Sequence, residues 1–177
     1  MFQFTVLAIT AAMVCLDQVT KWLAVLFLKN AEAVTVIPSV LGFTYVENRG
    51  AAFGILQGQR WLFLVLTGVI MIAILGLVLF GKFRAFRWFN VSATLIVAGG
   101  IGNFIDRLIQ GYVVDFIQVQ FFDFPVFNVA DCYVVVGSVL LLIFFFFLYD
   151  EHPIFATPKA EESHARSFSN AHATMVS

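Results

Sequence analysis

The sequence predicts an all-α membrane protein, a single domain of four transmembrane helices. Of the 177 residues, 61% are hydrophobic and only 12% are charged, whereas a soluble domain has about half apolar and about a quarter charged residues. The chain also contains 22 phenylalanines. Four apolar runs approach the ~20 residues that cross ~30 Å of hydrocarbon. The composition and the length of the apolar runs therefore both indicate an integral membrane protein.

The four predicted helices cover about residues 4–28, 61–80, 89–109 and 129–149. They form one domain over residues 1–150, and the polar segment 151–177 is expected to be a disordered tail. The 81–88 segment contains Lys82, Arg84 and Arg87, the densest basic cluster between any two helices. The positive-inside rule places this loop in the cytoplasm. With four spans, both termini and the tail are then expected to be cytoplasmic.

The segments 29–60 and 110–128 would then lie on the outer side of the membrane. Residues 35–37 and 42–46 are rich in β-branched and aromatic side chains, which predicts two short strands. Asn48, Arg49 and Gly50 follow as a turn. Residues 112–120 alternate, so that Asp115 shares one face of a third extended segment with apolar neighbours. Gly111, just before it, is expected to end the third helix.

Composition also excludes several kinds of function. The net charge of −1 gives no reason to expect nucleic acid as a partner. Cys15 and Cys132 both lie in predicted helices, without disulfide or metal-type spacing. All three histidines, at positions 152, 164 and 172, lie in the tail. A His-dependent triad or a His-ligated zinc site in the membrane body is therefore not expected.

The stretch from residue 99 to residue 131 carries the main functional signal. It contains Asp106, Asp115, Asp123 and Asp131, four of the eleven acids, between two apolar runs. Charge near lipid is costly and often marks function. On the predicted third helix, one face carries Gly99, Asn103, Asp106 and Arg107. The neighbouring glycines at 100 and 102 allow another backbone to approach this helix closely.

Asp115 and Asp131 are the candidate catalytic pair. Asp115 follows the outer end of the third helix, and Asp131 lies in the first turn of the fourth. A separation of 16 positions is enough for the chain to double back and bring the two carboxyl groups together. Two carboxylates in contact share a proton, and one apparent pKa rises. Such a pair can activate a water and protonate a carbonyl oxygen, which is peptide hydrolysis without a covalent intermediate.

Structural explanations of the same residues remain open at this point. Asn128 and Asp131 have the spacing of a helix cap with a first-turn acid. Asp106 and Arg107 have the pattern of a charge pair at the membrane interface. Asp115 could be an exposed loop acid.

Asp17 and Lys21 are a second polar feature, on one face of the first helix at i, i+4 spacing. They form either a structural ion pair or part of a site. A different function is also open, because Asp17, Lys21, Asp106 and Asp131 could relay protons or ions in a small transporter. The acids gather near one face of the membrane, however, and no transporter-type repeat is present. A purely structural membrane subunit would explain none of these motifs.

The sequence resembles the lipoprotein (type II) signal peptidase family. The resemblance covers about residues 4–149 and rests on separate motifs in family order: Asp17-Gln18-x-x-Lys21, NRGAAF at 48–53, GGIGNFIDR at 99–107, VVDF at 113–116 and FNVAD at 127–131. It implies that Asp115 and Asp131 are catalytic. Supporting or positioning residues would be Asp17, Asn48, Gly50, Asn103, Asp106, Arg107, Asn128 and Ala130, and we add Lys21 as the partner of Asp17.

The resemblance further implies a small β-sheet cradle outside the membrane and a monomer without metal or cofactor. The enzyme would lie in the bacterial inner membrane among lipids, with its site near the outer face. The substrates would be prolipoproteins whose lipobox cysteine carries diacylglycerol, cleaved on the N-terminal side of that cysteine. Two departures are minor: Val134 stands where Ile is common, and Cys132 follows Asp131, where a thiol packs as a small apolar group.

Overall fold

The computed structural model describes residues 2–50, 56–81, 83 and 86–148. Sequence predictions for residues 51–53, Lys82, Arg84, the three histidines and the tail lie outside these residues. The chain divides into two units, Met1–Leu140 and Leu141–Ser177. The sheet, the first three helices and the start of the fourth belong to the first unit.

Four helices in the described part of the chain are long and apolar enough to cross a membrane. They are α1 (Phe2–Leu28), α2 (Arg60–Phe80), α3 (Arg87–Ile109) and α4 (Val129–Ile143), and a π-helical stretch, η3 (Phe144–Leu148), follows α4. The prediction of four spans is confirmed. The third helix begins two residues earlier than predicted, because the backbone is extended at Phe86 and becomes helical at Arg87, a good helix former.

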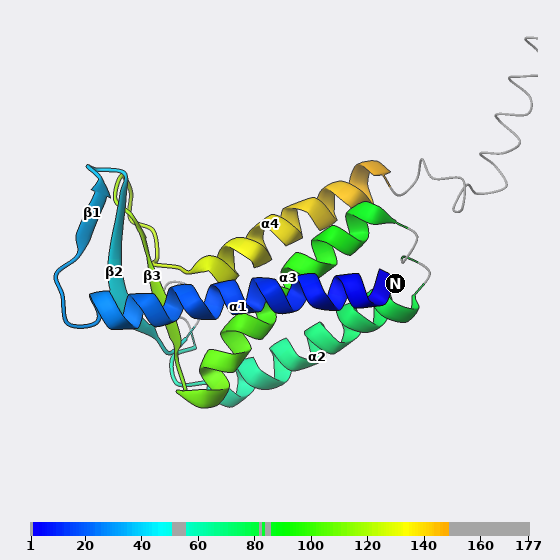
Figure 1. Ribbon diagram of the computed structural model, residues 1–177, viewed down its shortest axis with the longest axis horizontal. Coiled ribbons are helices and arrows are strands. Elements are labelled where there is room, and N and C mark those ends of the chain that lie inside the picture. The colour runs from blue at the N-terminus through cyan, green and yellow to red at the C-terminus, as the bar shows by residue number, and fades with distance from the viewer. Residues whose placement is uncertain (1, 51–55, 82, 84–85, 149–177) are drawn as a thin grey trace, which may run out of the picture. The chain divides into compact units, whose positions relative to one another are not determined.

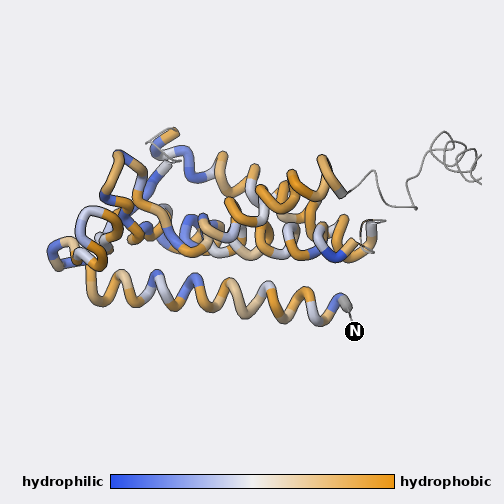
Figure 2. The backbone as a smooth tube through the Cα atoms, turned by 90° about the horizontal axis from the view of Figure 1, so that it is seen from above, coloured by the Kyte–Doolittle hydropathy of each residue, from blue (hydrophilic) through white to orange (hydrophobic). Residues whose placement is uncertain are grey.

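Helix α3 is the central helix of the first unit. Half of its apolar window is buried, against 17% for α1 and 11% for α2, and both of these helices pack against it. The side chains that α1 and α2 leave exposed are mainly large and apolar, as expected for surfaces that face lipid. Figure 2 shows the helices as predominantly hydrophobic, with most strongly hydrophilic residues toward the end that carries the sheet.

A three-stranded antiparallel sheet lies at one end of α1 and α3 (Figure 1). Its strands are β1 (Val34–Ile37), β2 (Leu41–Asn48) and β3 (Val113–Val119), in the order β1-β2-β3. All three predicted strands are confirmed. Asn48 was assigned to a turn, but it is the last residue of β2 and pairs with Val113. Gly111, with φ of 84°, ends α3 as expected.

Two glycines of α3 allow α1 and α4 to approach it at the level of the polar residues. A Cβ added at Gly102 would collide with the carboxylate of Asp17 on α1. One added at Gly99 would collide with the backbone carbonyl of Ala130 on α4. Ala130 itself is fully buried. The close packing predicted for this face is confirmed, and it brings buried charge on α1 against the polar face of α3.

Candidate active site

A pocket of about 970 Å³ opens between the sheet and the helices. Its polar lining includes Asn48, Gly50, Arg107, Asp115 and Asp131, contributed by β2, the segment after it, α3, β3 and α4. Its apolar lining includes Phe63, Val135 and Val136, from α2 and α4. The tertiary structure therefore brings both acids of the predicted pair into one cavity, next to apolar side chains of two membrane helices.

Asp115 lies on β3, where it pairs with Val46 of β2, and is only 1% exposed. Its two oxygens accept hydrogen bonds from two asparagines: Asn48 Nδ2 donates to Oδ2 at 2.8 Å and Asn128 Nδ2 to Oδ1 at 2.6 Å. Burial, and then the nearby charge of Asp131, raise the pKa of the Asp115 carboxyl to about 7, although the two amides oppose this rise. The alternative of an exposed loop acid was wrong.

Asp131 lies in the first turn of α4 and forms a reciprocal cap with Asn128. The backbone N–H of Asn128 donates to Asp131 Oδ2 at 3.1 Å, and the backbone N–H of Asp131 donates to Asn128 Oδ1 at 2.9 Å. This capping arrangement satisfies two N–H groups at the helix start. The structural explanation of this pair is therefore correct, and it places Asp131 in the pocket at the same time.

Asparagine side chains connect the two carboxylates. Asn103 Nδ2 donates to Asp131 Oδ1 at 2.8 Å, while Asn103 Oδ1 accepts from Asn128 Nδ2 at 3.2 Å. Asn128 in turn donates to Asp115. One continuous chain of hydrogen bonds therefore runs from Asp131 through two amides to Asp115, and each carboxylate oxygen of the pair accepts at least one hydrogen bond from the protein.

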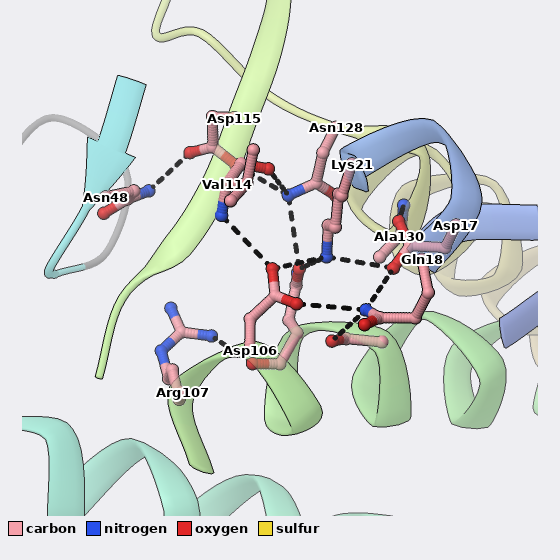
Figure 3. Close-up of polar contacts among 12 residues, drawn as sticks. Asp17, Gln18, Lys21, Asn48, Asp106, Arg107, Val114, Asp115, Asn128 and Ala130 are labelled. Carbon is pink, nitrogen blue, oxygen red and sulfur yellow. Dashed lines mark hydrogen bonds and ion pairs between the residues drawn. The ribbon is translucent and has the colours of Figure 1, made fainter. Parts of the chain in front are cut away.

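A closed cluster of charges lies behind these amides (Figure 3). Lys21 Nζ is 2.9 Å from Asp17 Oδ2, 3.1 Å from Asp106 Oδ2 and 2.8 Å from Asn103 Oδ1. Asp17 also accepts from the backbone N–H of Ala130 at 2.9 Å. The predicted pairing of Asp17 with Lys21 is confirmed. Asp106 pairs with Lys21, so the alternative of an ion pair with Arg107 was wrong.

Arg107 points into the site and holds the segment after β2. Its Nη2 donates to the carbonyl of Gly50 at 3.0 Å, and its guanidinium carbon lies 4.7 Å from the ring centroid of Phe63. The backbone N–H of Gly50 donates to Asn48 Oδ1 at 3.0 Å. Arg107 therefore connects α3 to the strand end that carries one of the amide donors to Asp115.

The predicted site residues fall into three groups: five line the pocket, Asn103 and Asn128 each donate to one of the two acids, and Asp17, Lys21, Asp106 and Ala130 form the cluster behind them. Sequence reasoning missed Gln18, whose Nε2 donates to Asp106 Oδ1 at 3.0 Å and to the carbonyl of Gly102 at 3.2 Å. A signal was available, because Gln18 lies beside Asp17 in an otherwise apolar run. Asp123 and Cys132 also line the pocket.

The arrangement places two carboxyl groups on one pocket, connected through the amides of Asn103 and Asn128. Asp115 holds its proton to about neutral pH, and Asp131 lies close enough to raise its pKa. Among the described residues, no group of three or more His, Cys, Asp and Glu side chains could hold a metal ion. Two carboxyl groups on one pocket can act together as general base and general acid when one is ionised and the other is protonated.

Comparison with known proteins identifies the family. The signal peptidase (SPase) II family, an aspartic peptidase family, matches residues 9–147. The chain belongs to the signal peptidase II family. As a signal peptidase II, it is an aspartic peptidase of four membrane spans.

Individual relatives support the same assignment. The lipoprotein signal peptidase of Streptococcus thermophilus is 44% identical over 135 residues, covering 75% of this chain and 86% of the relative. That of Streptococcus pyogenes serotype M1 is 45% identical over 131 residues, covering 74% and 86%. Two solved bacterial membrane enzymes superimpose with TM-scores of 0.73 and 0.72 at 39% and 37% identity; they cover 78% and 81% of this chain, which corresponds to 85% and 94% of theirs.

Proposed function

We propose that Asp115 and Asp131 are the catalytic pair of this enzyme and that they share one proton. The enzyme is a lipoprotein signal peptidase, which removes signal peptides from prolipoproteins. The observation that carries the proposal is the amide of Asn128. It donates to Asp115 at 2.6 Å, while its oxygen accepts from the backbone of Asp131 at 2.9 Å. The side chain of Asn128 thus contacts both acids at the wall of the same pocket.

In the proposed reaction, the ionised member of the pair accepts a proton from a water molecule. The resulting hydroxide attacks the carbonyl carbon of the scissile peptide bond, and the protonated member donates its proton to the carbonyl oxygen. The tetrahedral intermediate then collapses: the C–N bond breaks, the amine leaves with the proton that the first carboxyl group received, and the second carboxylate takes a proton back from a hydroxyl of the intermediate as the product carboxyl group forms. Both carboxyl groups end the cycle with one proton between them, ready for the next water.

The other predicted site residues support this pair in the proposal. Asn48, Asn103 and Asn128 donate to its carboxylate oxygens. Arg107 holds Gly50 at the pocket wall and offers a planar guanidinium to the substrate backbone. A cluster of four residues lies behind the site and holds α1, α3 and α4 together: Asp17, Lys21, Asp106 and Ala130.

The substrate is proposed to be a prolipoprotein whose cysteine already carries diacylglycerol. The pocket has polar residues beside the sheet and apolar ones on two membrane helices, which suits a polypeptide attached to lipid. The acyl chains would stay in the bilayer while the bond on the N-terminal side of the cysteine reaches the acids. Membrane lipids are then the surroundings of the reaction, and a monomer without cofactor is sufficient.

The site is proposed to face the outer side of the bacterial inner membrane. The basic segment joins the end of α2 to the start of α3, and both of these helix ends lie away from the sheet (Figure 1), so a cytoplasmic position for this segment places the pocket outside. Both termini and the tail would then be cytoplasmic, with residues 1–150 forming the whole peptidase domain.

Cleavage assays on two variants test the catalytic pair. Asp115→Asn and Asp131→Asn preserve shape but remove the groups that exchange protons. Purified in detergent and given a diacylglyceryl-modified prolipoprotein, each should lose nearly all turnover, and the double variant should be little worse. Because Asn caps helices as well as Asp, an Asp131 that served only as a cap would retain activity in Asp131→Asn. Substantial turnover by either single variant would refute the pair.

A further inference from the structure

Lys21 is a buried cation that cannot touch the substrate. It is 3% exposed, and the two acids beside it, Asp17 and Asp106, are 0% and 5% exposed. The three side chains lie between α1 and α3, and none of them lines the pocket. A lysine in this position is costly unless every N–H of its ammonium group is satisfied. Any contribution of Lys21 to the reaction must therefore pass through another residue.

The three N–H groups of the ammonium have three acceptors. Two are the carboxylates of Asp17 and Asp106, at 2.9 and 3.1 Å. The third is the side-chain oxygen of Asn103, at 2.8 Å, which is the shortest of the three contacts. The two acids balance the charge of the ammonium and join α1 to α3, and the third N–H still needs an acceptor. That acceptor is the asparagine that also donates to Asp131, so the contact to Asn103 connects the buried ion pair to the acid pair.

The contact determines which way the amide of Asn103 points. Its oxygen accepts from both Lys21 and Asn128, at 2.8 and 3.2 Å, so its nitrogen is directed to Asp131 Oδ1 at 2.8 Å. A flipped amide would place N–H groups against the ammonium and an oxygen against the carboxylate. Both contacts would be repulsive. Lys21 therefore disfavours the one rotation of Asn103 that would remove its hydrogen bond to Asp131.

We propose that Lys21 is a positioning residue of the peptidase: by occupying the side-chain oxygen of Asn103, it locks the amide that orients Asp131. This inference rests on the proposed role of Asp131 in catalysis. It distinguishes Lys21 from the two acids beside it, which neutralise the ammonium and hold the backbone N–H groups of Ala130 and Val114.

A double-mutant cycle tests whether Lys21 acts through Asn103. Lys21→Met removes the ammonium at similar length and should lower kcat by about 10–100-fold, the usual cost of losing a residue that orients a reactive group, with KM nearly unchanged. In an Asn103→Ala background, the same substitution should lower kcat no further. Wild-type kcat in Lys21→Met, or losses that multiply in the double variant, would overturn the proposal.

Removal of Lys21 leaves two buried acids without their cation, so folding must be followed separately. Lys21→Gln repeats the cycle with a side chain that keeps two N–H donors without the charge, should Lys21→Met fail to insert. Thr20→Val is the matched control. It removes a side-chain hydrogen bond on the same helix, to the backbone carbonyl of Asp17, and leaves the contacts of Lys21 with Asp17 and Asn103 in place. Its kcat should stay close to that of the wild type.

The side-chain amide signals of Asn103 give a readout that needs no catalysis. In ¹⁵N-labelled protein in micelles, these signals are identified by their loss in Asn103→Ala. Wild-type protein should show one set, and Lys21→Met should show a second set or broadening as the amide rotates. An unchanged single set would overturn the positioning role even if the variant were inactive. Full activity of Asp131→Asn, in contrast, would refute the catalytic pair and leave the orientation of Asn103 unaffected.

Discussion

Asn128 donates its side-chain amide to Asp115 across a distance of 2.6 Å, although the two residues lie on different elements, the start of α4 and the middle of β3. The same side chain caps α4 by accepting from the backbone of Asp131. Asn128 is therefore both the cap of α4 and the side chain that connects the two acids. Because the amide must serve both ends, neither acid can move without disturbing the other.

Asn128→Ala should separate these two roles. Without the amide, Asp115 loses its shortest hydrogen bond and α4 loses its cap, which alone costs about 1 kcal/mol. We expect kcat to fall by about 100-fold, much more than the stability change explains. The measurement is cleavage of a lipidated prolipoprotein beside thermal unfolding. Asn90→Ala is the control, since Asn90 donates to the Phe86 carbonyl at the other end of α3; a similar loss of kcat there would point to a general packing effect.

The pH dependence of kcat should follow the proton on Asp115. Burial and the neighbouring Asp131 raise the pKa of this carboxyl to about 7, against the opposing amides of Asn48 and Asn128 and the charge of Lys21. The active form keeps one proton on the pair, so activity should be present below this pKa and be lost as pH rises through about 7. A rate profile from pH 5 to 9 measures the alkaline limb. A flat profile to pH 9 would contradict the shared proton.

Arg107→Lys keeps the charge but loses the planar fork that contacts Gly50 and lies over Phe63. We expect kcat/KM to fall by at least about tenfold while membrane insertion stays normal. Arg60→Lys is a matched control, because Arg60 also donates to a backbone carbonyl, that of Leu108, but does not line the pocket. Equal behaviour of the two variants would mean that Arg107 only anchors the helix.

Gly102→Ala should disrupt the packing of α1 on α3. The added methyl group would collide with the Asp17 carboxylate and lie 3.2 Å from the Ala130 Cβ. Overpacking of this kind costs about 1–3 kcal/mol and would also displace the partner of Lys21. Gly76→Ala is the control, since a methyl group there meets nothing within 4 Å. Denaturation in detergent should show a loss of stability for Gly102→Ala alone; equal stability of both variants would contradict the tight contact.

The proposed orientation can be tested with a reporter that is active only outside the cytoplasm. Fused after Ser177, it should remain silent, because the positive-inside rule predicts that the basic 81–88 segment is cytoplasmic, and the C-terminus is then cytoplasmic too. The same reporter inserted after Ser39, in the β1–β2 turn, should be active. Activity at the C-terminus would place the pocket on the wrong side of the membrane.

The sequence by itself determined the class of protein and the location of its strands and helices. Twenty-residue apolar runs have few folding solutions in a bilayer, since backbone N–H and C=O groups must be satisfied within the helix. The alternation around Asp115 was equally decisive, because a period of two fits an extended strand. The resemblance of the motifs to the signal peptidase II family further implied which two acids form the candidate catalytic pair.

Only the tertiary structure decided the partners of each polar residue. Asp106 and Arg107 are neighbours in the chain, but helical geometry turns one toward Lys21 on α1 and the other toward Gly50. The sequence could not show that Asn48 ends a strand and reaches Asp115, because strand register depends on pairing between distant segments. The role of Lys21 was likewise hidden, since its third acceptor, Asn103, lies 82 residues away in the chain.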